Sequence, residues 1–198
     1  MVCKLMKGGC VMRNKTLQVE KMLEIENWIE SMHDTIFCDS ISDEGLLKKL
    51  NLKLEYVNQD EFAPHTEAEL CPCNDEGYFG LIRVNKKYIN NRFAYMHEII
   101  HYLLDVGLGK RVEKVFSRKT RGNTADEHEQ EVNYATAAAI LKYKDMKDAI
   151  LEYDRSKPKM DELLFVRNIC KKYNQETTTV IRRVKEVRTL MKKRMANY

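Results

Sequence analysis

The chain has 198 residues, enough for one domain with a sizeable core, and is 43% hydrophobic and 32% charged, as expected of a globular protein. With 3 Pro and 8 Gly it is not a linker-rich or low-complexity sequence. The net charge of +4 is uneven, because residues 155–198 hold thirteen Lys and Arg against four Asp and Glu. No apolar run suggests a signal peptide or a membrane span, so we expect a cytoplasmic protein with reduced thiols.

The first part of the chain predicts an arm followed by two helices. Residues 1–15 lack periodicity and are expected to form a loose N-terminal arm. Thr16 can cap a helix in which apolar residues recur with a period near 3.6. Ser42 marks the start of a second, shorter helix.

Strand-like alternation comes next. Residues 51–57 alternate between apolar and charged side chains, which predicts a half-buried strand. Residues 59–78 are interpreted as a polar loop, and residues 78–85 as a second strand. If that second strand is an edge of the sheet, an extended substrate can pair with it.

The centre of the chain carries the sequence His-Glu-Ile-Ile-His, from His97 to His101. A helix is expected here, starting near Asn90 or Asn91, either of which can cap it, and stopping at Gly107. Residues four apart share a helix face, so both histidines would bind one zinc ion, and Glu98 would act as general base towards a metal-bound water. The alternative to a zinc site is that both histidines lie on the protein surface and that Glu98 is a solvated charge.

A zinc hydrolase needs a third protein ligand, and a helix over about 124–144 offers three glutamates. Glu131 is the preferred ligand, because small alanines follow it on the same face and permit close packing. Glu127 is the alternative ligand, although it can instead close a capping box. Glu129 is expected to point away, and His128 is a candidate for orienting a ligand or stabilising an oxyanion.

Two cysteines, Cys71 and Cys73, flank a single proline. They could bind a metal or provide an inhibitory thiolate to the zinc. No second pair of cysteines completes a structural zinc site, so loop cysteines without a metal role are the favoured interpretation.

Helices are expected to fill the rest of the chain: one over about 146–153, a break at 156–159, and two within 161–193. The fold class is therefore α+β, a small mixed or antiparallel sheet packed on the His97 helix, followed by a mostly helical C-terminal half. We divide the chain into the arm, a metallopeptidase domain over 16–153 and a basic helical pair over 154–198.

Three segments carry a resemblance to a known family. Residues 80–85 form a strand that ends in Asn, residues 91–104 place Arg-Phe before the HExxH motif, and residues 131–135 form the later Glu helix. Together they resemble the ImmA/IrrE metallopeptidases, and the likeness extends over about residues 45–190. Residues 169–184 are similar to that family's final helix pair, which looks like a helix-turn-helix remnant.

The resemblance implies a zinc-dependent, site-specific protease that cleaves a helix-turn-helix repressor and so derepresses mobile-element or stress genes. It also implies that the basic C-terminal half binds this repressor. Two alternatives remain open. The chain could be an antirepressor or toxin-like module that sequesters a partner without cleaving it. It could also bind DNA through the basic helices within residues 161–193, in which case replacing Arg182, Arg183 and Lys185 should abolish binding.

Overall fold

A computed structural model describes residues 17–33, 35–37, 42–119, 127–156 and 161–196. It confirms the α+β class. The described helices and strands are α1 (Val19–His33), α2 (Asp43–Lys49), β1 (Leu52–Val57), β2 (Thr66–Cys71), β3 (Gly80–Asn85), α3 (Arg92–His101), β4 (Phe116–Lys119), α4 (Glu127–Ile140), α5 (Tyr143–Arg155), α6 (Glu162–Tyr173) and α7 (Thr177–Ala196). A π-helical turn, η3 (Tyr102–Val106), continues α3.

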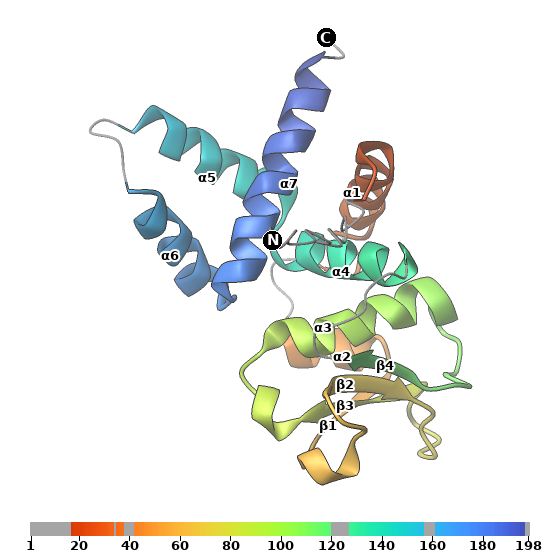
Figure 1. Ribbon diagram of the computed structural model, residues 1–198. Coiled ribbons are helices and arrows are strands. Elements are labelled where there is room, and N and C mark those ends of the chain that lie inside the picture. The colour runs from red at the N-terminus through yellow and green to blue at the C-terminus, as the bar shows by residue number, and fades with distance from the viewer. Residues whose placement is uncertain (1–16, 34, 38–41, 120–126, 157–160, 197–198) are drawn as a thin grey trace, which may run out of the picture.

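The elements are stacked in layers, with the sheet at one end of the molecule (Figure 1). Helix α3 lies on the sheet and contacts β2, β3 and β4, and α4 packs on α3 from the other side. Helices α1 and α7 contact α4 in turn. The helix that carries the HExxH motif is therefore enclosed between the sheet and the helical half.

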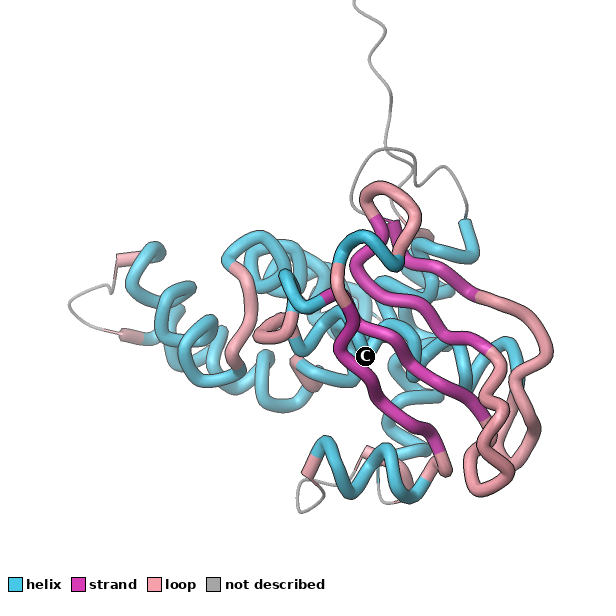
Figure 2. Tube along the Cα trace, turned by 90° about the horizontal axis from the view of Figure 1, so that it is seen from below, coloured by secondary structure: helices cyan, strands magenta, loops and turns pink. Residues whose placement is uncertain are grey.

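The four strands form a mixed sheet in the order β1-β3-β2-β4 (Figure 2). Strand β1 runs parallel to β3, whereas β2 runs antiparallel to both β3 and β4. The condition for substrate pairing at residues 78–85, that this strand is an edge, is not met, because β3 is hydrogen-bonded on both sides. Within the described part of the chain, the edges are β1 and β4.

One of these strands lies in the segment interpreted as a polar loop, and another lies where no strand was predicted. Strand β2 falls within 59–78, where only Ala68 and Leu70 provide the apolar positions between Glu67 and Glu69. Glu69 of β2 is paired with Arg83 of β3, at 2.6 Å between Oε1 and Nη1, so its charge is matched across the sheet. Strand β4 falls within the basic stretch after Gly107 and is four residues long.

Helix α3 is fixed at its start by several polar contacts. The side chain of Asn91 accepts a hydrogen bond from the Phe93 amide, which confirms the expected cap. Arg92 and Tyr95 both bind the carboxylate of Asp43 in the first turn of α2. These contacts fix the position of the first turns of α3, which precede His97.

Gly107 ends the helical segment with a φ of +94°, a conformation that favours glycine, and this confirms the expected stop. The helix expected to reach residue 144 instead ends at Ile140, and α5 begins at Tyr143. The arm at 1–15, the Thr124 capping box and most of the break at 156–159 lie outside the described residues. No helix in the described ranges has the length and apolar character needed to cross a membrane.

Candidate metal centre

The two histidines of the motif are buried side by side on α3. His97 is fully buried, and His101 is 2% exposed. Their ring centroids lie 4.8 Å apart with the planes at 74°. Glu98, between them in sequence, is also fully buried. The four-residue spacing thus brings both imidazoles together, as the sequence predicts. The alternative interpretation, that both histidines lie on the surface, is wrong.

The carboxylate that meets these histidines belongs to Glu129, in the first turn of α4. Its Oε1 lies 3.1 Å from His101 Nε2, and its Oε2 lies 3.4 Å from His97 Nε2. In a tetrahedral site with bonds of about 2.0–2.1 Å, neighbouring ligand atoms are about 3.3–3.4 Å apart. Each carboxylate oxygen is thus about one such edge from one imidazole nitrogen, and the ligand atoms of the three residues lie within 4.8 Å of one another, so this group could hold a metal ion.

The structure does not bring Glu131 to the histidine pair. Glu131 Oε2 lies 3.4 Å from Lys21 Nζ on α1. On the same side of α4, the hydroxyl of Tyr134 donates to Glu26 of α1. The side of α4 that carries Glu131 therefore faces α1, and Glu129, two residues earlier, faces α3. The expectation that Glu129 points away is wrong for the same reason.

The other candidates on α4 lie outside this triad. Glu127 is exposed and belongs to neither group of potential metal ligands among the described residues. His128 Nε2 lies 2.9 Å from Asp105 Oδ1, and its ring centroid is 5.8 Å from that of His101. His128 is thus beside a histidine of the triad, where an orienting residue is expected.

Electrostatics in the metal-free site reflect the same contacts. Burial lowers the pKa of His101, but hydrogen bonds to Glu129 and Asp105 outweigh this and raise it to about 9. Burial raises the pKa of Glu129, and its hydrogen bonds to His101 and His97 more than reverse this, so that its carboxyl stays ionised. The ionised Glu129 carboxylate therefore favours positive charge at this site, supplied either by protons on the histidines or by a metal ion.

An edge of the sheet reaches this site. The ring of Phe116, the first residue of β4, stacks on the ring of His101, with centroids 5.4 Å apart. Strand β4 pairs with β2 on one side, and no described strand pairs with its other side. The backbone edge next to the histidines is thus β4, where the sequence had suggested residues 78–85.

The cysteine pair takes no part in the triad. Cys71 ends β2, and its thiol donates to the carbonyl of Leu81. Burial raises the pKa of Cys71 to about 11, which disfavours a thiolate. Neither Cys71 nor Cys73 belongs to a group of potential metal ligands within the described ranges.

The residues considered for DNA binding do not form one surface. Arg183 is fully buried and pairs with Glu26 at 2.6 Å. Arg182 and Lys185 are exposed on α7. A DNA-binding face built on all three residues is therefore excluded by the position of Arg183.

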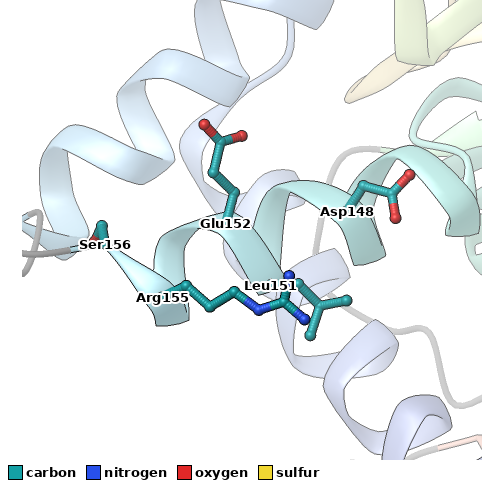
Figure 3. Close-up of a pocket in the computed structure, with 5 residues that line it drawn as sticks. All are labelled: Asp148, Leu151, Glu152, Arg155 and Ser156. Atoms are coloured by element: carbon teal, nitrogen blue, oxygen red, sulfur yellow. The ribbon is translucent and has the colours of Figure 1, made fainter.

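A separate hollow of about 600 Å³ lies on α5 and its C-terminal end (Figure 3). Its lining residues are Asp148, Leu151, Glu152, Arg155 and Ser156. They offer charges of both signs and neither histidine nor cysteine. The hollow is away from α3 in the fold, and it does not compete with the triad as a site for metal chemistry.

An HExxH motif on a buried helix, completed by a carboxylate from a later helix, is a metallopeptidase type of site. A family model described as the IrrE N-terminal-like domain, a peptidase family, matches residues 52–184, from β1 into α7. The chain belongs to this family, which confirms the ImmA/IrrE resemblance. No curated protein matches the chain.

Proposed function

We propose that the protein is a zinc-dependent peptide-bond hydrolase in which His97, His101 and Glu129 hold the metal. Glu129 takes the role that the sequence had suggested for Glu131. The observation that carries this assignment is the approach of the Glu129 carboxylate to both imidazoles: its two oxygens lie 3.1 Å from His101 Nε2 and 3.4 Å from His97 Nε2, and the ligand atoms of the three residues lie within 4.8 Å of one another. Family membership supports the peptidase reaction.

Zinc at this position would lower the pKa of water towards about 7 and polarise the scissile carbonyl. Glu98 is the proton carrier: it accepts a proton as the nucleophile forms and returns it to the departing amine. Its carboxylate lies on the same buried helix as both histidines, one residue after His97, and is itself fully buried. In this setting its charge acts on the reacting atoms with little screening.

The substrate chain binds along β4 in this proposal. The outer edge of β4 offers backbone groups that an extended peptide can pair with, and Phe116 places this edge against His101. The strand therefore aligns a peptide bond with the histidine pair. This replaces the sequence-based proposal that residues 78–85 bind the substrate.

We propose a helix-turn-helix repressor as the protein substrate, cleaved at a specific site to derepress mobile-element or stress genes. The ImmA/IrrE resemblance supports this choice. Exposed basic side chains in residues 154–198 are suited to hold such a partner outside the catalytic site, among them Lys171, Lys172 and Arg182. The protein would act in the cytoplasm, where such repressors bind DNA.

The test compares the wild type with Glu98→Gln, which preserves the shape of the side chain and removes its basicity. Each is purified, its zinc content is measured, and it is incubated with the helix-turn-helix protein encoded nearest to its own gene. We expect equal zinc content and a loss of cleavage of about 10²–10⁴-fold, read as new N-termini by mass spectrometry.

Different results would refute different parts of the proposal. Equal cleavage by Glu98→Gln would refute the role of Glu98. Derepression in cells that survives Glu98→Gln and chelation would favour the antirepressor or toxin-like module. New N-termini in other proteins, with an intact repressor, would refute the substrate and retain the peptidase.

A further inference from the structure

Asp105 lies between a histidine of the triad and a histidine of α4. Its Oδ2 is 2.6 Å from His101 Nδ1, and its Oδ1 is 2.9 Å from His128 Nε2. The Asp105 side chain is 18% exposed, although the residue as a whole lies at the surface. No sequence motif singled out Asp105 within its segment.

The two nitrogens of His101 face different partners. Nε2 faces Glu129, at 3.1 Å, and Nδ1 faces Asp105. A nitrogen that binds a metal ion must be free of its proton, so the proton of the neutral ring has to be on the other nitrogen. When Nε2 is the ligand, Nδ1–H therefore donates to Asp105.

We propose that Asp105 is a positioning residue for the metal ligand His101: it holds the proton on Nδ1, directs Nε2 at the metal and ties His128 to the same carboxylate. The inference rests on the proposed zinc site. Carboxylates that accept a hydrogen bond from a metal-binding histidine fix its tautomer and raise its basicity, and their removal typically weakens metal binding about 10–100-fold.

The local backbone supports this role. Asp105 lies in the π-helical turn η3, which begins directly after His101 and is closed by a hydrogen bond from the Gly107 amide to the Tyr102 carbonyl, at 2.8 Å. Such turns are rare and are often found at functional sites. Here the turn carries the carboxylate that the second histidine of the motif contacts.

The contact with His128 joins the two elements that supply the triad. His128 immediately precedes Glu129 at the start of α4, and Asp105 follows α3. One carboxylate thus holds the end of the histidine helix close to the start of the helix that brings Glu129. Replacing Asp105 therefore removes its contact with His101 and its contact with His128 of α4 at the same time.

The experiment measures zinc affinity by competition with a chelator for the wild type, Asp105→Asn and His128→Ala. An asparagine amide can donate to Nδ1 and so favours the proton on Nε2, the wrong nitrogen. We expect zinc binding about 10–100-fold weaker in Asp105→Asn, and a smaller loss in His128→Ala, which keeps the contact between Asp105 and His101. Thermal unfolding of the metal-free proteins shows whether each variant is folded.

A measurement on the wild type keeps the proposal testable if Asp105→Asn does not fold. Nitrogen-15 NMR of the zinc-loaded protein should show His101 protonated at Nδ1 and bound through Nε2. Binding through Nδ1, or wild-type zinc affinity in a folded Asp105→Asn, would overturn the role of Asp105 alone. If the wild type binds no zinc, the proposed function fails as well, so the two failures are distinguishable.

Discussion

Replacing Arg183 by methionine tests how the C-terminal helix is held in the fold. Arg183 is completely buried in α7, and its Nη1 lies 2.6 Å from Oε1 of Glu26, which is 1% exposed. Its Nε donates to the carbonyl of Leu141, and its guanidinium lies over the ring of Tyr134. One side chain of α7 therefore contacts α1, α4 and the residue that follows α4.

The size of the effect follows from this burial. Arg183→Met leaves the Glu26 carboxylate buried, with the Tyr134 hydroxyl as a remaining hydrogen-bond donor. Breaking a buried ion pair from one side costs about 3–5 kcal/mol of unfolding free energy. For a chain of this length, that corresponds to a fall in melting temperature of roughly 6–20 °C.

The neighbouring Arg182 provides the control. Its side chain is 48% exposed and pairs with Glu186 at 3.4 Å, so Arg182→Met should cost at most about 1 kcal/mol. Unfolding of both variants is followed by circular dichroism in urea. Adding Glu26→Leu to Arg183→Met removes the unpaired charge and should recover part of the loss. Equal stability of the Arg182 and Arg183 variants would refute this reasoning.

Two further predictions concern the triad. In a chelator competition, Glu129→Gln should weaken zinc binding by more than the roughly 100-fold expected for a residue that only contacts a ligand. Glu131→Gln should bind zinc as the wild type does. The reverse result would restore Glu131 as the ligand. In the metal-free protein, the raised pKa of His101 contributes stability that is complete below about pH 6.5 and is lost as the pH rises through about 9. Urea unfolding with chelator present should show this decline, and His101→Gln should reduce it; an unchanged slope in that variant would contradict the assignment.

The histidine helix could be predicted from sequence because its information is local. The four-residue spacing, the Asn91 cap and the Gly107 stop each depend on residues within a few turns of one another. The choice between Glu129 and Glu131 depends on how α4 is rotated between two neighbours. That rotation is set by contacts with α1, more than a hundred residues earlier in the chain, as the Tyr134–Glu26 hydrogen bond shows.

The short strands were missed for a related physical reason. In β2, Ala68 and Leu70 alternate with Glu67 and Glu69, but the segment is short and its acidic residues are poor strand formers without cross-strand partners. Glu69 is matched by Arg83 on the adjacent strand. Strand β4 has four residues and is stabilised by pairing with β2. Neither segment has a pattern strong enough to predict a strand alone.

Helix α4 connects the candidate catalytic site to the rest of the molecule. Glu129 at its start faces the histidines, while Glu131 and Tyr134 on another side contact α1, to which Arg183 of α7 is also bound. The position of Glu129 relative to the histidines therefore depends on packing that includes α7. If the basic C-terminal region holds the substrate, as we propose, the element that binds the partner and the carboxylate that completes the triad belong to one continuous packed structure. Partner binding at α7 would then change the position of Glu129 through the packing of α4. The zinc affinity of Arg183→Met, measured under conditions where it is folded, tests that connection directly.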